Sequence, residues 1–283
     1  MAWMLTDTRP AAWGSLMMDG TILVVLIISV LSSVAGSICG IGGGVIMKPL
    51  LDAVGIMSVS EISFLSGCAV LAMSVVSVYK NMHGKRAVLQ LKTVVILAVG
   101  AAAGGVMGKV LFQLLRQEVG NENLVGMVQA VVLALITLGT LLMTVRKSRI
   151  HTLQCEKMWI VCLIGLLLGI LSSFLGIGGG PMNIVVLEYF FSMKTKEAAA
   201  SSLFVIMLSQ AAGLIQTLLS GTVPEVPLTF LAVMIAGGMA GGMIGGRVSR
   251  RLEEQMVNRL FMLLMAVIVG ISIRNAVLFG GGM

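Results

Sequence analysis

Long stretches without any charged side chain are the feature of this sequence that most restricts its fold. Six of them lack Asp, Glu, Lys and Arg altogether: residues 20–47, 62–79, 123–145, 158–187, 198–224 and 226–246. About 20 apolar residues are enough for a helix to cross the hydrocarbon core of a bilayer. Only 11% of the 283 residues are charged, whereas soluble domains carry about 25%. The sequence therefore predicts a polytopic membrane protein and argues against a water-soluble enzyme.

The two halves of the chain repeat a glycine motif. Gly40-Ile41-Gly42-Gly43-Gly44 recurs 136 residues later as Gly176-Ile177-Gly178-Gly179-Gly180. The same offset pairs Glu61 with Glu197, Ser66 with Ser202 and Asp52 with Glu188. An offset of 137 aligns Gly104-Gly105 with Gly241-Gly242 and sets Lys109 beside Gly246. Two homologous halves are the economical interpretation.

Each half contains a long apolar segment, the glycine motif, a short apolar segment and three more long segments. In the first half these segments are residues 21–39, 44–55, 61–80, 91–113 and 123–145. In the second half they are residues 158–175, 180–193, 197–219, 227–247 and 257–276. The short pieces follow glycine and are too brief for an ordinary span, so we expect half-helices or re-entrant segments. The predicted fold is an all-α membrane protein with four long transmembrane helices and one short piece per half.

Basic residues gather in four connections, and this sets the expected orientation. Those connections hold 14 of the 19 Lys and Arg residues: Lys80, Lys85, Arg86, Lys92, Arg146, Lys147, Arg149, Lys157, Lys194, Lys196, Arg247, Arg250, Arg251 and Arg259. Because Lys and Arg favour cytoplasmic loops, both termini are predicted to be extracytoplasmic. Arg9, Lys109, Arg116 and Arg274 fall on the outer side, and Lys48 lies in a short segment.

This orientation makes the two halves an inverted-topology repeat, because segment 21–39 runs inward and its partner 158–175 runs outward. The predicted organisation is an extracytoplasmic segment 1–20, a first transmembrane repeat 21–145, a cytoplasmic linker 146–157 and a second repeat 158–283. Inverted repeats with interrupted helices are characteristic of secondary transporters.

The glycine motifs are the best candidates for a substrate site. Consecutive glycines disfavour a continuous helix, because each costs about 1 kcal/mol relative to alanine. A helix that restarts after Gly44 and after Gly180 presents unpaired N–H groups and a positive dipole end to the protein interior. The expected anion ligands are therefore the N–H groups of Gly42, Gly43, Gly44, Gly178, Gly179 and Gly180. Glycines spaced by four, such as Gly100, Gly104 and Gly108, are interpreted instead as close helix crossings.

Side chains near the motifs could add to this site. Lys48 follows the first motif and would favour an anion, although it could also extend to the membrane interface. Asn183 follows the second motif and could either donate to an oxyanion or bond to a neighbouring helix. Ser37 and Ser173 precede the two motifs and are further substrate-binding candidates.

Three acids are candidates for coupling transport to protons. Glu61 and Glu197 begin equivalent long segments, and Glu188 lies in the second short segment. For Glu61 the spacing from Ser58 also fits a capping box, which would give it a structural role. The sequence contains no nucleotide loop, catalytic triad, metal-ligand cluster or basic aromatic patch, so we expect no catalytic residue, cofactor, bound metal or nucleic-acid partner. The oligomeric state stays open.

The doubled Gly-Ile-Gly-Gly-Gly, one copy in each half, resembles the sulfite exporter TauE/SafE family of bacterial inner-membrane permeases. The resemblance extends over residues 18–280. It implies transport of small sulfur-containing anions, such as sulfite, sulfoacetate or other organosulfonates, across the cytoplasmic membrane. The family commonly has proline a few residues after each motif, whereas here Pro49 follows at that distance and Pro181 follows at once.

The sequence-based hypothesis is alternating access, with the two halves moving around an anion site near the middle of the membrane. Two alternatives remain at this stage. A cation or metal transporter would use the intramembrane acids, and a non-transporting membrane component would tolerate disruption of the motifs.

Overall fold

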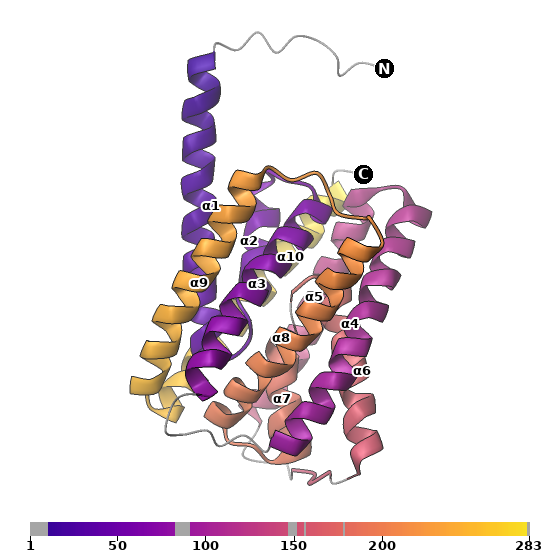
Figure 1. The fold of residues 1–283 in the computed structure, drawn as a ribbon, viewed down its shortest axis with the longest axis vertical. Coiled ribbons are helices and arrows are strands. Elements are labelled where there is room, and N and C mark those ends of the chain that lie inside the picture. The colour runs from indigo at the N-terminus through magenta and orange to yellow at the C-terminus, as the bar shows by residue number, and fades with distance from the viewer. Residues whose placement is uncertain (1–10, 83–90, 147–151, 156, 178, 282–283) are drawn as a thin grey trace.

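The computed structural model describes residues 11–82, 91–146, 152–155, 157–177 and 179–281. Over these residues the regular structure is entirely helical, without strands. The helices, drawn in Figure 1, are α1 (Ala11–Cys39), α2 (Gly44–Val54), α3 (Val59–Met82), α4 (Leu91–Val119), α5 (Glu122–Val145), α6 (Met158–Leu175), α7 (Gly180–Phe191), α8 (Thr195–Leu219), α9 (Leu228–Arg251) and α10 (Glu254–Gly281).

Eight of the described helices are long and apolar enough to span a membrane, and α2 and α7 are the short ones. This confirms the predicted alternation of long and short segments. Several helices extend beyond the predicted apolar stretch, since backbone hydrogen bonding continues into the polar flanks. The clearest case is α1, which begins at Ala11, so half of the segment expected to precede the first repeat is helical.

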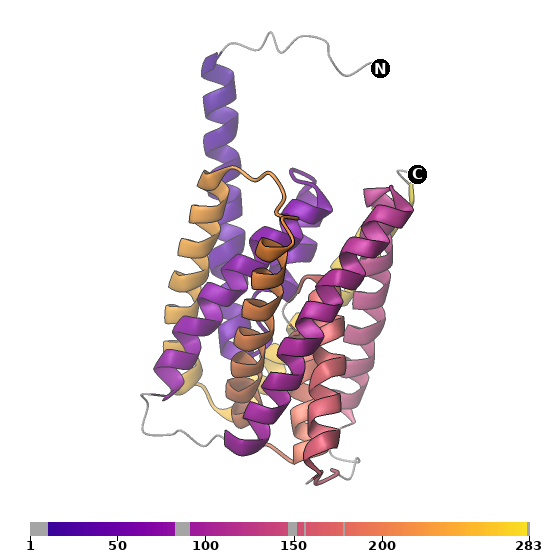
Figure 2. The ribbon, with the colours of Figure 1, turned by 45° about the vertical axis from the view of Figure 1, so that its right-hand side comes forward.

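The helix ends divide between the two ends of the bundle. In Figures 1 and 2, α3, α5, α7 and α9 end at the lower side, where α4, α6, α8 and α10 begin. The start of α1, the end of α10 and the α8–α9 connection lie at the upper side. The flanks of the four basic connections thus share one end of the molecule, and the two ends of the described chain share the other.

The exterior is apolar and the interior is rich in hydroxyl groups. Large apolar side chains project outward from the long helices, among them Leu31, Leu135, Trp159, Leu263 and Val277. Buried serines occur in most of the same helices, including Ser33, Ser63, Ser173, Ser202 and Ser272. A surface of this kind suits a lipid environment, where the outer side chains need not be polar.

Glycines allow the backbones of neighbouring helices to touch. A Cβ added at Gly100 would lie 2.2 Å from the carbonyl oxygen of Cys162, and one at Gly104 would lie 2.1 Å from that of Leu166. These contacts pack α4 directly on α6, and Gly241 packs α9 on α1 in the same way. The interpretation of these glycines as helix-crossing residues is confirmed.

We predict that Gly104→Ala lowers the unfolding temperature of the detergent-purified protein. The new methyl group would meet backbone atoms that cannot move independently, and overpacking of this kind costs about 1–3 kcal/mol. Gly270→Ala is the matched control, because a Cβ there has no neighbour within 4 Å. A Gly104→Ala protein that melts with the wild type would contradict the backbone contact.

Candidate functional site

Both glycine motifs interrupt the chain between a long helix and a short one. α1 ends at Cys39 and α2 begins at Gly44, while α6 ends at Leu175 and α7 begins at Gly180. Left-handed backbone angles make the turns possible, with φ of 73° at Gly42 and 106° at Gly179. Residues other than glycine rarely adopt such backbone angles. The turns therefore require glycine at these positions of the motifs.

The two interruptions meet inside the bundle. A Cβ on Gly44 would lie 2.7 Å from the carbonyl oxygen of Ile177, and one on Gly180 would lie 2.5 Å from the side chain of Val45. The N-terminal ends of α2 and α7 are therefore neighbours, although the motifs are separated by more than one hundred residues in sequence. First-turn N–H groups have no acceptor within their own helix, and here two sets of them come together.

The remaining motif glycines lie within the same packed centre. Gly43 precedes α2, and its α-carbon faces the backbone of Ser33 in α1. Gly179 faces the amide of Asn183, with 2.5 Å between a built Cβ and the Asn183 Nδ2 atom. The Asn183 Oδ1 atom is buried and has no hydrogen-bond partner in the described part of the chain. Gly178 lies outside the described residues.

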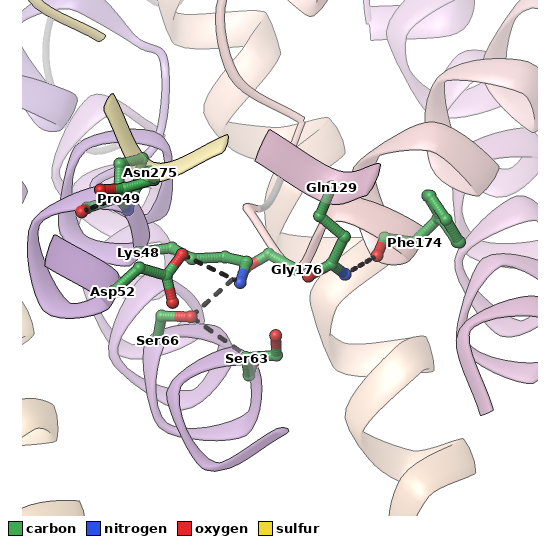
Figure 3. A network of polar contacts seen from close by, with 9 residues as sticks. All are labelled: Lys48, Pro49, Asp52, Ser63, Ser66, Gln129, Phe174, Gly176 and Asn275. Atoms are coloured by element: carbon green, nitrogen blue, oxygen red, sulfur yellow. Dashed lines mark hydrogen bonds and ion pairs between the residues drawn. The ribbon is translucent and has the colours of Figure 1, made fainter. Parts of the chain in front are cut away.

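Lys48 is buried and paired, as Figure 3 shows. Its ammonium group lies 3.3 Å from Asp52 Oδ2, one helical turn further along α2. Only 3% of Lys48 is exposed, so it does not extend to a surface. Asn275 of α10 donates to the Pro49 carbonyl at 2.8 Å and holds this part of α2 in place. The charge of Lys48 is thus balanced within its own helix.

Hydrogen bonds from other helices also fix the second interruption. Ser66 of α3 donates to the Gly176 carbonyl at 3.3 Å, and Gln129 of α5 donates to the Phe174 carbonyl at 2.6 Å (Figure 3). Carbonyl groups at the end of α6 lose their intrahelical donors, and these two side chains replace them. The second motif is consequently held by helices of the first half.

Ser37 and Ser173 are equivalent residues of the two repeats, but they lie in different parts of the bundle. The Ser37 hydroxyl lies 3.0 Å from that of Ser77 and next to α9, where Gly245 makes room for it. Ser173 lies against Gly108 of α4, and its hydroxyl has no partner among the described residues. The structure does not bring these two serines together.

The three candidate acids have different surroundings. Glu61 accepts from the Ser58 N–H at 2.7 Å, and the Glu61 N–H faces the Ser58 hydroxyl at 3.3 Å, which forms the capping box that the spacing indicates. Glu188 is buried and accepts from the Thr195 hydroxyl at 2.7 Å. Glu197 lies in the first turn of α8. In the described residues no three His, Cys, Asp or Glu side chains form a metal-binding group.

This arrangement of eight spanning helices and two facing interruptions agrees with a match to known proteins. Residues 25–273 match the family described as Sulfite exporter TauE/SafE. The chain belongs to the TauE/SafE family. This family consists of membrane transporters, so the chain is a multi-pass membrane transporter and not an enzyme.

A curated relative is consistent with this TauE/SafE assignment. It is described as a probable membrane transporter protein, YunE, from Bacillus subtilis (strain 168). The two chains are 22% identical over 222 residues, which are 71% of this chain and 80% of the relative. No solved structure gives a significant match.

One buried cation of this TauE/SafE protein, Lys109 of α4, was not predicted as a site residue from the sequence. It is 5% exposed and has no hydrogen bond or ion pair within the described part of the chain. A built Cβ on Gly213 would lie 3.6 Å from the Lys109 Cε and 3.5 Å from the Ser173 Oγ, so these two side chains face the same spot. Its position could have indicated burial in the membrane, since Lys109 is the sole charged residue between Lys92 and Arg116.

We predict that Asp52→Asn destabilises the protein more than the double replacement Lys48→Met with Asp52→Asn. Removing one partner of a buried ion pair costs about 3–5 kcal/mol, because the other charge stays buried without compensation. Thermal unfolding of the two single variants and the double variant measures the coupling. Additive losses in the double variant would show that the pair does not act as a unit.

Proposed function

We propose that this protein is a secondary transporter that carries small sulfur-containing anions across the cytoplasmic membrane by alternating access. Sulfite, sulfoacetate and other organosulfonates are the expected substrates. The N–H groups of the two motifs bind the oxyanion, with Asn183 beside the second motif. Ser37 and Ser173 contribute from two separate places, and Lys48, paired with Asp52, holds α2 in position.

The observation that carries this proposal is the contact between the two helix interruptions at Gly44 and Gly180. Helix N-termini attract anions through their free N–H groups and their positive dipole ends. Two facing N-termini within a bundle of eight spanning helices provide such a site away from bulk water. Lys109, a buried cation without a bonded acid in the described residues, adds positive charge nearby.

The helix contacts support two halves of inverted topology. α1 packs on α9 as α6 packs on α4, and α3 packs on α9 as α8 packs on α4. In each comparison the equivalent helices of the two halves have labels that differ by five, as α1 and α6 or α4 and α9 do. In Figures 1 and 2, α1 begins at the upper end of the bundle and α6 at the lower end. Two similar units of opposite direction can expose one site alternately to each side.

The membrane potential favours export of such a substrate. Moving one charge through 100 mV is worth about 2.3 kcal/mol, and an inside-negative potential drives an anion outward. Import would need a coupled proton or cation. In that case Glu188, which is buried within α7, the short helix that follows the second motif, is the candidate for coupling.

We predict that a sulfur oxyanion or sulfonate raises the unfolding temperature of the purified protein. A ligand present at about 100 times its Kd stabilises the native state by about 2.7 kcal/mol. The panel contains sulfite, thiosulfate, sulfoacetate, sulfate and acetate, with divalent metal ions measured in parallel. Stabilisation by metals alone would overturn the proposal in favour of a cation transporter.

Transport should be lost in Gly43→Leu, because its side chain would enter the space between α2 and Ser33. Gly270→Leu is the control, since its position is open. Efflux of labelled sulfite from proteoliposomes is the measurement, and Gly43→Ala serves as a milder variant if the leucine protein does not insert. Unchanged efflux in a correctly inserted Gly43→Leu protein would refute the site.

A further inference from the structure

One end of the bundle contains a cavity lined by positive charge. Its volume is about 420 Å³, and its charged lining residues are Lys80, Lys196 and Arg250. No acid lines it within the described part of the chain, and none of the three cations forms an ion pair there. Its lining includes Ala199, whose backbone lies directly against Gly40 of the first motif. The wall of the cavity is thus in contact with the first glycine motif.

A smaller cavity of about 70 Å³ lies at the other end, beside the α8–α9 connection. Its lining includes two cations, Lys109 and Arg116, together with Phe112, Gln113 and Ser63. Ser63 lies against Gly176 of the second motif, where a built Cβ would be 3.0 Å from its hydroxyl. Each cavity therefore ends at one of the two motifs.

The two cavities are formed by equivalent residues of the two halves. At an offset of 136, Lys196, Ala199 and Ala200 of α8 correspond to Ser60, Ser63 and Phe64 of α3. At an offset of 137, Gly246, Ser249 and Arg250 of α9 correspond to Lys109, Phe112 and Gln113 of α4. The contacts with the glycine motifs are equivalent too, because Gly40 and Gly176 are themselves a repeat pair.

Side-chain size accounts for the difference in volume. Where the large cavity has Gly246 and Ser249, the small one has Lys109 and Phe112. The hydrogen bonds of the equivalent residues differ as well. Gln113 donates to Thr222 in the α8–α9 connection, and both residues line the small cavity. Its counterpart Arg250 donates instead to the Gly246 carbonyl of its own helix at 3.1 Å.

We propose that the two cavities are the entrance and exit of one anion pathway, open beside Arg250 and closed by Phe112, with Lys109 as the anion-binding cation of the closed side. The proposal rests on the proposed function and adds the residues that bind and gate the substrate. A sulfonate or sulfur oxyanion enters the basic cavity, reaches the facing motifs, and leaves past Lys109 once α3 and α4 separate from the α8–α9 connection.

Cysteine accessibility tests the open and closed sides directly. Single cysteines replace Ala199 and Ser63, which are equivalent residues at the inner ends of the two cavities, in a protein whose native cysteines Cys39, Cys68, Cys155 and Cys162 are changed to alanine. The probe is 2-sulfonatoethyl methanethiosulfonate, a small reagent that carries a sulfonate. In detergent it reaches both ends of the protein at once.

The cysteine at 199 should react about tenfold faster or more than the cysteine at 63, because an alternative open state is populated at about 0.1–10%. Phe112→Ala should then accelerate the reaction at position 63. Leu111→Ala is the control, since Leu111 is exposed and does not line the cavity. Equal reaction rates at 199 and 63, or no acceleration by Phe112→Ala, would overturn the assignment of open and closed sides.

The role of Lys109 has a separate readout. Lys109→Gln should weaken the apparent affinity for the stabilising anion about tenfold or more, the usual effect of losing a charged hydrogen bond. Lys92→Gln, an exposed position of the same helix, should leave that affinity unchanged. Equal affinity in the Lys109→Gln protein and the wild type would remove Lys109 from the pathway.

The cysteine reactions and the anion-induced stabilisation can fail separately, which distinguishes a failure of the pathway from a failure of the proposed function. If no anion stabilises the wild type but position 199 still reacts faster, the substrate class is wrong and the pathway stands. If an anion stabilises the protein but both cysteines react alike, the transporter proposal stands and the pathway proposed here is refuted.

Discussion

The structure depends on shielding two helix interruptions from the hydrocarbon of the membrane. Backbone groups that lack partners cannot face lipid, because each would cost several kcal/mol. Here the interruptions at Gly40–Gly44 and Gly176–Gly180 lie against each other, and helices of the opposite half cover them. Ser66 and Gln129 supply hydrogen bonds to the end of α6, and Asn275 supplies one to α2. The two halves are therefore mutually necessary, since each stabilises the interruption of the other.

Much of the fold follows from local signals that a sequence expresses well. Long apolar stretches with few or no charges set the eight long helices, and consecutive glycines set the two interruptions, because both signals act within one segment. The spacing by four of Gly100, Gly104 and Gly108 identified a close helix crossing, and the structure places α6 there. The capping box of Ser58 and Glu61 is also local and was equally predictable. The longer extent of α1 and α10 was not, since polar flanks carry no hydrophobic signal.

The candidate site was predictable only in part, because its chemistry depends on neighbours distant in sequence. Lys48 stood out as a cation within a short apolar segment, but its pairing with Asp52 requires that this segment be helical, so that residues four apart lie on one face. Lys109 was counted with the outer-side charges, since a sequence does not show how deep a residue lies in a helix of 29 residues. The basic cavity joins residues of α1, α3, α8 and α9, and only the packed bundle brings these four helices together.

The difference between the two buried lysines explains why the pathway should select anions without trapping them. Lys48 is paired with an acid, so its charge is largely cancelled and mainly fixes α2. Lys109 and the three cations of the large cavity lack such a partner in the described structure. Unpaired charge in a poorly hydrated site attracts an ion of opposite sign strongly. A carrier needs this attraction to be distributed along the route, because a single site of very high affinity would not release the substrate. The arrangement of separate cations at the open side, neutral N–H groups at the centre, and Lys109 with Arg116 at the closed side meets this requirement.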